Sequence, residues 1–384
     1  MFLKKAQRIF LPTCRHCVRN LATSSSLYAK AKDQKPDFIG KAQKLLDLAF
    51  EAYASKKYHF EQLDDIIFTT LSQQPDLKNH VVTQLKEKYK DEKVLKKLAH
   101  SFNQSNRRNG VWNKEFEKVD LYEAKPGFLA LPKDVAVHLI DKIDALKLLE
   151  EKIGGTEFNK RKILALDGES SIYNFVDKNI KASTIQLALE DTVFILDLDI
   201  IGKEKSLTSF LDGLFKNNSY LKIGHHFSKK DEKIHCALPE LKPIRNVVCI
   251  NSIVRELYYR TYILDQKLAD VIDADSDAEE KLNIVDGDIP PLIKLETFCE
   301  VLLPQKLNNK AESKSVWNRR PLRPGQIQYM ATKTYSLIMI HKVCEKWAQL
   351  LKEDLNSICD EILKQEAEEA AKEFASKNEI HKSK

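Results

Sequence analysis

Apolar residues recur along this chain with two different periods, which divides it into a helical region and a mixed α/β region. From residue 36 to about residue 106 they recur at helical spacing, as at Ala42, Leu45, Leu46 and Ala49, which predicts a small helical bundle. Later, short apolar runs bounded by turn residues predict strands at 162–167, 183–190, 192–197, 220–224 and 246–250. Three closely joined strands followed by strand–helix alternation indicate a mixed sheet flanked by helices.

Changes in composition set the expected segment boundaries. The polar, Asn-rich stretch 101–113 marks a boundary, so we expect a helical region at 33–106, a linker at 107–126 and the α/β domain at 127–352. Residues 132–140 are expected to open a helix. Residues 268–291 are rich in acids and predict an exposed loop before a helix at 292–303. The segment 353–384 is predicted to be a charged, solvated helix and tail.

Two acids stand at the end of the first strong strand pattern. Asp167 and Glu169 are two residues apart after the apolar run 163–166, and alternate side chains on a strand share one face. Paired carboxylates at a strand end are typical of metal-dependent phosphodiester hydrolysis, in which two divalent cations flank the reacting oxygens. Taken alone, however, such a pair of acids more often marks a solvated strand end.

Motifs downstream give these acids a context. The segment Trp317-Asn-Arg-Arg-Pro-Leu322 is followed by Gln326-Ile-Gln-Tyr329-Met-Ala. It resembles the W-x-x-R-P-L…Q-x-x-Y-A segment of DEDD-type 3′-5′ exonucleases of the ribonuclease D / MUT-7-like group. The runs at 186–188, 193–197 and 220–224 resemble later strands of that fold. The resemblance implies an RNase H-like sheet flanked by helices, preceded here by a small all-helical region.

The family pattern has four acids, and this sequence departs from it. Asp167 and Glu169 match the first motif, and Tyr329 matches the Tyr of the third. Lys333 stands four residues after Tyr329, where the family has Asp. Lys230 occupies the place of the second-motif Asp, with Asp231 one residue later. With Lys230 inward, two acids and two ammonium groups sum to zero charge. With Asp231 inward instead, the sum is minus two, and neither set matches the demand of two Mg²⁺ ions.

The resemblance with these departures predicts a degenerate exonuclease-like domain that binds or scaffolds nucleic acid, with RNA favoured over DNA, and catalyses little or nothing. Tyr329 is then vestigial, no cofactor is expected, and Lys333 is expected to form a salt bridge with Asp167 or Glu169. The alternative is an active 3′-5′ exonuclease that holds one weak Mg²⁺ or Mn²⁺ ion at Asp167, Glu169 and Asp231. A third possibility is a domain that makes only protein contacts.

The candidate nucleic-acid ligands are Lys222, Arg319 and Arg320, because the resemblance places the two arginines near a substrate groove and guanidinium groups bind phosphate. The competing interpretation is that either arginine forms a structural salt bridge. RNA or another single-stranded nucleic acid is the expected partner, together with a protein partner. No apolar run approaches the length of a membrane span.

The N-terminus carries a charge pattern of its own. Residues 1–32 contain seven basic residues and no acid, with apolar residues between them, which is typical of a mitochondrial transit peptide. We therefore expect a mitochondrial matrix protein. Because the whole chain is formally +6, the remainder sums to −1, so any nucleic-acid-binding surface must be a local patch.

Overall fold

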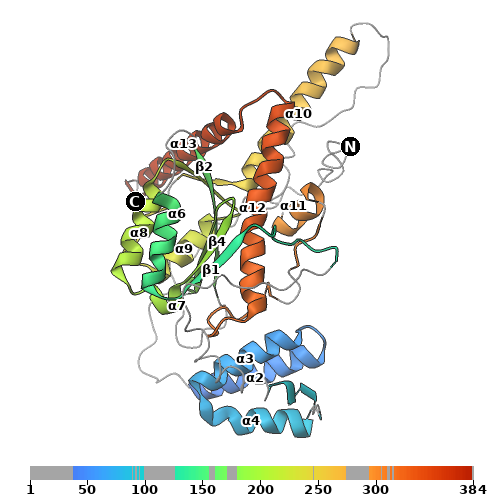
Figure 1. Cartoon of the computed structure of the whole chain (residues 1–384), viewed down its shortest axis with the longest axis vertical. Helices are drawn as coiled ribbons and strands as arrows, with labels where there is room; N and C mark the ends of the chain where they lie inside the picture. The colour runs from blue at the N-terminus through green and yellow to red at the C-terminus, as the bar shows by residue number, and fades with distance from the viewer. Residues whose placement is uncertain are drawn as a thin grey trace.

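The computed structural model describes residues 38–88, 90, 93–94, 96–98, 126–154, 161–170, 180–244, 246–273, 294–303, 305–308, 312–313 and 315–382. The predicted transit peptide, nearly all of the predicted linker and most of the predicted acidic loop lie outside these residues. Figure 1 shows the helical region, in blue, at one end of the molecule and the sheet with its flanking helices beyond it.

The helical region forms as the apolar spacing predicts. It comprises α2 (Phe38–Ala54), α3 (Phe60–Gln73), a 3₁₀ turn (Pro75–Leu77), α4 (Lys78–Thr83) and a π-helical turn (Gln84–Lys88). Leu46, Phe50, Leu63 and Ile67 are buried in its core. Val316 from the α/β domain is buried in the same core. The helical region is therefore packed onto the domain.

The second region is a six-stranded sheet of RNase H-like type. Its strands are β1 (Ala136–Ile140), β2 (Lys162–Glu169), β3 (Thr184–Ala188), β4 (Thr192–Asp197), β5 (Tyr220–Gly224) and β6 (Val247–Cys249). The order across the sheet is β1-β4-β3-β2-β5-β6. Strand β3 is antiparallel to both neighbours, whereas β1 pairs with β4, and β5 with β2 and β6, in parallel. All five strands predicted from sequence are confirmed.

The helix expected at 132–140 is wrong, because Ala136–Ile140 is the edge strand β1. Val135 and Val137 are both buried, and this period of two, with β-branched side chains, fits a strand that pairs with β4 along its whole length. A polar-interrupted run of nine residues contains too little periodicity to distinguish the two structures.

Helices cover both faces of the sheet, and the strands alternate between the two cores. On β4, Val193 and Ile195 belong to one core, and Phe194 and Leu196 to the other. The second core is completed by α6 (Leu146–Gly154), α7 (Leu198–Ile201), α8 (Lys205–Lys216) and α9 (Ser228–Ala237). The first is completed by α10 (Ile250–Asp273), α11 (Leu295–Leu302), α12 (Pro324–Leu350) and α13 (Leu355–Lys382). The helix expected at 292–303 is thus confirmed as α11.

The C-terminal helix corrects a second expectation. We predicted a solvated helix and tail from residue 353, but Leu355, Ile358, Cys359 and Ile362 are buried in the first core. These four residues recur at helical spacing on one stripe, which the surrounding charges obscure in the sequence. The α/β domain therefore extends through the first turns of α13.

Candidate functional site

The two motif acids lie at the end of β2, in the middle of the sheet. Asp167 and Glu169 share the strand face of Ala165, which belongs to the core that contains α12. Asp167 is only 1% exposed, and its Oδ1 accepts a hydrogen bond from the Gly168 amide at 2.8 Å. A carboxylate this deeply buried requires a positive partner.

Two lysines supply the positive charge. Lys333, on α12, places its ammonium 3.1 Å from Asp167 Oδ2 and 2.5 Å from Glu169 Oε1. Lys230, near the start of α9, approaches from a different helix and contacts Asp167 Oδ1 directly. The predicted salt bridge of Lys333 is confirmed, with both acids at once. Both lysines thus contact the acids at the end of β2.

The electrostatics bind these four groups into one neutral cluster. Burial alone raises the pKa of Asp167, but the ammonium groups of Lys230 and Lys333 outweigh it and hold that pKa well below its usual range. Burial likewise lowers the pKa of Lys333, yet Asp167 and Glu169 raise it well above its ordinary value.

The other two members are held less firmly in their charged forms. Burial raises the pKa of Glu169, although the Lys333 ammonium opposes this shift by stabilising the charged carboxylate. Burial lowers the pKa of Lys230 although Asp167 opposes the shift. A proton moved from Lys230 to Glu169 leaves the sum at zero, so the cluster is neutral in either arrangement. Two net charges were considered from the sequence, zero with Lys230 facing the acids and minus two with Asp231 facing them. The structure has the first, with Lys230 facing the acids.

Asp231 does not join this cluster. Its Oδ1 lies 3.2 Å from His235 Nδ1, one turn along α9, because a helix rotates successive side chains by about 100°. The set of Asp167, Glu169 and Asp231 that the alternative reading requires is therefore not assembled. Among the residues that the structure describes, no group of three or more His, Cys, Asp or Glu side chains is arranged to hold a metal ion.

Tyr329 lies one helical turn before Lys333 and is buried against the motif segment. Its ring stacks on Trp317 with centroids 5.9 Å apart, and the Lys333 ammonium lies 5.6 Å from the ring centroid. Burial raises the pKa of its hydroxyl. The tyrosine therefore remains a neutral group beside the lysine–carboxylate cluster.

The three predicted nucleic-acid ligands are all engaged inside the protein. Lys222 is fully buried on β5, and its ammonium donates to the Asn217 carbonyl at 3.0 Å. Arg320 contacts Asp197 at 2.6 Å and Asp199 at 3.0 Å. Both side chains thus have internal acceptors where phosphate-facing side chains were expected: the Lys222 ammonium is buried and must use an acceptor inside the protein, and the Arg320 side chain, 19% exposed, is paired with two carboxylates.

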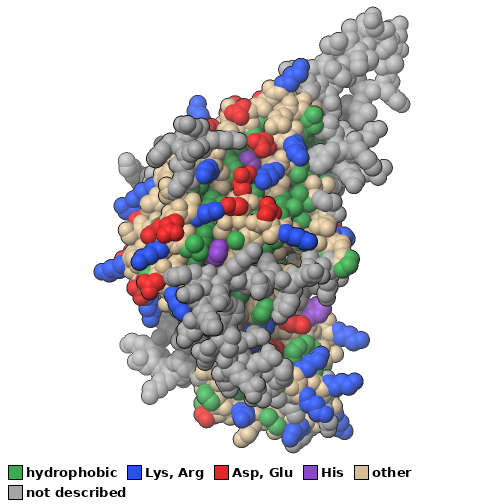
Figure 2. All heavy atoms as spheres, in the orientation of Figure 1, with side chains coloured by type: hydrophobic (Ala, Val, Ile, Leu, Met, Phe, Trp, Pro, Cys, Tyr) green, Lys and Arg blue, Asp and Glu red, His purple; other side chains and the backbone are tan. Residues whose placement is uncertain are grey.

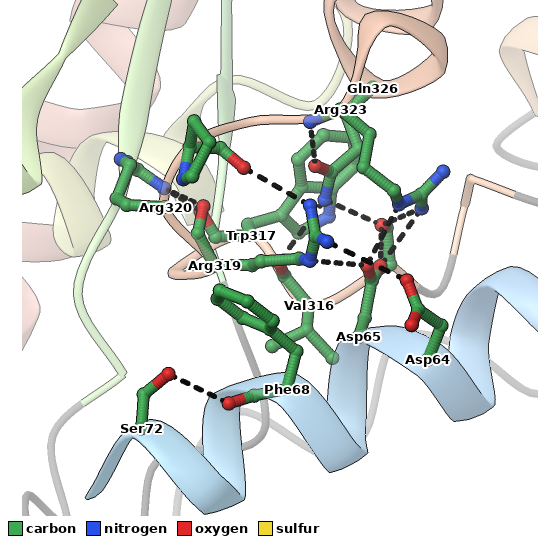
Figure 3. Close-up of polar contacts among 12 residues, drawn as sticks. Asp64, Asp65, Phe68, Ser72, Val316, Trp317, Arg319, Arg320, Arg323 and Gln326 are labelled. Carbon is green, nitrogen blue, oxygen red and sulfur yellow. Dashed lines mark hydrogen bonds and ion pairs between the residues drawn. The ribbon is translucent and has the colours of Figure 1, made fainter. Parts of the chain in front are cut away.

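Arg319 fails the same expectation for a different reason: it joins the two regions of the chain. It is 3% exposed and lies 3.2 Å from Asp65 and 3.6 Å from Asp64, both on α3. Its guanidinium also covers the Phe68 ring at 4.5 Å. Figure 3 shows Arg319 and Arg323 reaching down from the motif segment to these acids. The structural salt bridge, weighed above as the competing interpretation, is what forms at both Arg319 and Arg320.

Asp64 and Asp65 were missed as partners in the sequence, although a signal was present. They interrupt a helical stripe that includes Leu63, Ile66 and Ile67. Acids flanked by buried positions on one helix need a cation from elsewhere in the fold, and the Arg-Arg pair of the motif segment was available.

Comparison with known proteins identifies the family. A family model described as 3′-5′ exonuclease matches residues 137–346, more than half of the chain. The protein therefore belongs to the 3′-5′ exonuclease family, and the domain it contains is a 3′-5′ exonuclease domain. No match was found among curated proteins.

Several solved structures are similar in fold. The exonuclease domain of Nibbler from Aedes aegypti is 21% identical, with 62% of this chain and 99% of that chain covered and a TM-score of 0.45. The catalytic core of RRP6 from Trypanosoma brucei is 15% identical, with 64% and 55% covered and a TM-score of 0.43. RNase D from Trypanosoma brucei, solved in complex with RNA U12, is 14% identical, with 59% and 69% covered and a TM-score of 0.41.

Proposed function

We propose that this protein is a non-catalytic member of the 3′-5′ exonuclease family that binds RNA as a scaffold or adaptor. One observation carries the proposal: Lys230 and Lys333 each place an ammonium group on the acids that remain of the family's four. The fold is kept, and the part of the site that performs the chemistry is replaced by an internal salt bridge.

The residues present do not fit a pair of divalent cations. Such ions require several oxygen ligands each, and hydrolysis in this kind of site depends on both. Here each carboxylate already has an ammonium ligand, and a cation entering the cluster would meet two positive charges at close range. A metal ion that displaced the Lys333 ammonium would leave that ammonium without an acid partner. Because the Lys333 side chain is only 14% exposed, the unpaired charge would be buried, which is costly.

The alternative, an active exonuclease with one ion at Asp167, Glu169 and Asp231, has less support. Retention of Asp167, Glu169 and Tyr329 favours it. The pairing of Asp231 with His235 weighs against it, because the third ligand points away from the other two. The alternative requires α9 to rearrange on metal binding.

Incubation of the purified chain with labelled single-stranded RNA or DNA and Mg²⁺ or Mn²⁺ tests the proposal. We expect no more 3′-5′ trimming than is seen with an Asp167→Ala variant prepared in parallel. Trimming by the wild-type chain that requires metal and is lost in Asp167→Ala would overturn the proposal and establish the alternative.

A gain-of-function variant tests the same cause directly. Lys230→Asp with Lys333→Asp restores four acids, and we expect calorimetric titration to show Mn²⁺ binding that the wild-type chain lacks. Lys203→Asp with Lys205→Asp makes the same charge change at exposed positions and serves as the matched control. Equal Mn²⁺ binding by the wild-type chain would contradict the idea that the ammonium groups exclude the ions.

We further propose that the protein works in the mitochondrial matrix with a protein partner. The seven bases and absence of acids in residues 1–32 support import. Residues 1–40 fused to a fluorescent protein should direct it to mitochondria. A diffuse cytosolic signal would refute the proposed mitochondrial location. In the part of the chain that the structure describes, none of the helices is long and apolar enough to cross a bilayer.

A further inference from the structure

The described surface of the helical region carries many more basic than acidic side chains. Its described residues include ten exposed lysines: Lys41, Lys44, Lys56, Lys57, Lys78, Lys86, Lys90, Lys93, Lys96 and Lys97. Among the acids of this region whose exposure the structure describes, Glu51 and Asp76 alone are exposed. Figure 2 shows blue side chains spread over this end of the molecule with few red ones between them.

The contact with the exonuclease domain adds to this asymmetry. Asp64 and Asp65 are buried and paired with Arg319, and Asp65 also with Arg323 at 2.8 Å. Two of the region's negative charges are thus neutralised internally, while its lysines remain at the surface. Docking onto the domain leaves the outer surface more basic than the sequence of the region suggests.

Five of these lysines gather at one end of the bundle, and we call them the lysine patch: Lys56, Lys57, Lys93, Lys96 and Lys97. Lys56 and Lys57 lie in the turn between α2 and α3. Lys93, Lys96 and Lys97 are three and four residues apart in a helical segment, and such side chains share a face. The Lys97 ammonium lies 5.2 Å from the centroid of Phe60, the first residue of α3, which brings the two groups of lysines together.

We propose that the lysine patch binds the phosphate backbone of single-stranded RNA. Clustered lysines bind phosphates by releasing counterions and need no base-specific contact. Membership of a nuclease family makes a nucleic acid the partner of choice. A membrane surface fits less well, because binding there is stronger where apolar side chains also insert beside the basic ones. The exposed large apolar residues described in this region, Ile39 and Leu48, lie along α2 outside the patch.

This assignment replaces the one expected from sequence. The nucleic-acid ligands expected from the sequence make internal contacts instead, namely Lys222, Arg319 and Arg320. The acid–lysine cluster at the end of β2 has no net charge that would attract phosphate. The inference rests on the RNA-binding half of the proposed function and moves the binding surface from the former catalytic face to the helical region.

Binding of a labelled single-stranded RNA oligonucleotide by the full chain, measured by fluorescence anisotropy over a salt series in chelator-containing buffer, provides the test. The patch variant combines Lys56→Gln, Lys57→Gln and Lys97→Gln. The control combines Lys203→Gln, Lys205→Gln and Lys216→Gln, exposed lysines of the exonuclease domain. Both lose three charges, and both keep the basic N-terminus.

We expect the patch variant alone to lose affinity. The slope of log K against log salt is negative, and removing three phosphate contacts should make it less steep by about 2. At about 0.1 M salt this corresponds to a loss of about 100-fold in affinity. Equal loss in both variants, or no loss in the patch variant, would overturn the inference while leaving RNA binding itself intact. Absence of RNA binding by the wild-type chain would instead remove the RNA-binding half of the proposed function as well.

Lipid headgroups are the other source of phosphate, and vesicles of phosphatidylcholine with phosphatidylserine test whether the lysine patch binds them. We expect weak binding that the patch variant does not alter by more than the control. Vesicle binding that depends on the patch, combined with unchanged RNA affinity, would assign the lysines to a membrane surface and overturn the inference.

Discussion

At the scale of single residues, Lys333 is the cation that joins the two acids at the end of β2. Its ammonium contacts both Asp167 and Glu169 from a side chain that is 14% exposed. Lys333→Ala leaves Lys230 as the remaining described cation in contact with these acids. We expect a loss of about 3 kcal/mol in the free energy of unfolding, because a buried charge is left without its partner.

Chemical denaturation can measure this loss against a control on the same helix. Lys342 pairs with Glu190 at 3.2 Å, but both side chains are largely solvated, so Lys342→Ala should change stability by less than about 1 kcal/mol. Similar losses for the two variants would show that the lysine–carboxylate cluster contributes no more than a surface ion pair.

His341, further along α12, predicts a pH dependence. It is 7% exposed, and burial lowers its pKa from 6.5 to about 4, against a weaker opposing pull from Glu190. Below pH 6.5 the unfolded chain takes up a proton that the folded chain does not. Stability is therefore lost as pH falls from about 6.5 to about 4, by up to about 3 kcal/mol.

Denaturation curves across this pH range provide the measurement. His341→Leu should flatten the acid limb of stability against pH, since no proton uptake then distinguishes the two states at this position. An equally steep limb in His341→Leu would mean that other groups account for it.

At the scale of secondary structure, the sequence is most informative where an element is buried on both faces. Strands β2 to β5 were predictable, because short, mostly apolar runs such as 163–166 and 193–196 are bounded by turn residues and are too short for helices. Strand β1 was not, since an edge strand exposes polar side chains and resembles a helix start after Pro132. The buried stripe of α13 was hidden for a similar reason, among charges on its outer faces.

The packing of α13 makes a prediction at this scale. Ile358 is 1% exposed in the core that α13 shares with α10 and α12. Ile358→Ala should cost about 2–4 kcal/mol, by lost burial and the cavity left behind. Leu350→Ala, at a residue 73% exposed, should cost little. Thermal melts of the two variants compare them, and an unaltered Ile358→Ala would restore the solvated helix first expected.

The acid–lysine cluster at the end of β2 and the contacts of Arg319 and Arg320 show how far sequence reasoning reaches at the scale of the whole molecule. That lysines stand at 230 and 333, where the family resemblance leads one to expect acids, could be read from the sequence. The choice between Lys230 and Asp231 could not, because it depends on where α9 begins relative to β5. The roles of Arg319 and Arg320 depended on contacts with residues more than a hundred positions away, which no local pattern specifies.

Asp65 tests whether the two regions of the chain are one cooperative unit. Fully buried on α3, it accepts from Ser315 at 2.9 Å and from Arg323 at 2.8 and 2.9 Å, and lies 3.2 Å from Arg319. Glu312 also pairs with Arg323 at 2.8 Å, but it does not replace Asp65 at Arg319.

Asp65→Ala should therefore destabilise the molecule by about 3–5 kcal/mol. If this contact couples the regions, the variant should unfold in two calorimetric transitions where the wild-type chain shows one. Asp76→Ala, at an exposed acid of the same region, is the control and should melt like the wild-type chain. A single, unshifted transition in Asp65→Ala would mean that the apolar contact around Val316 alone holds the regions together.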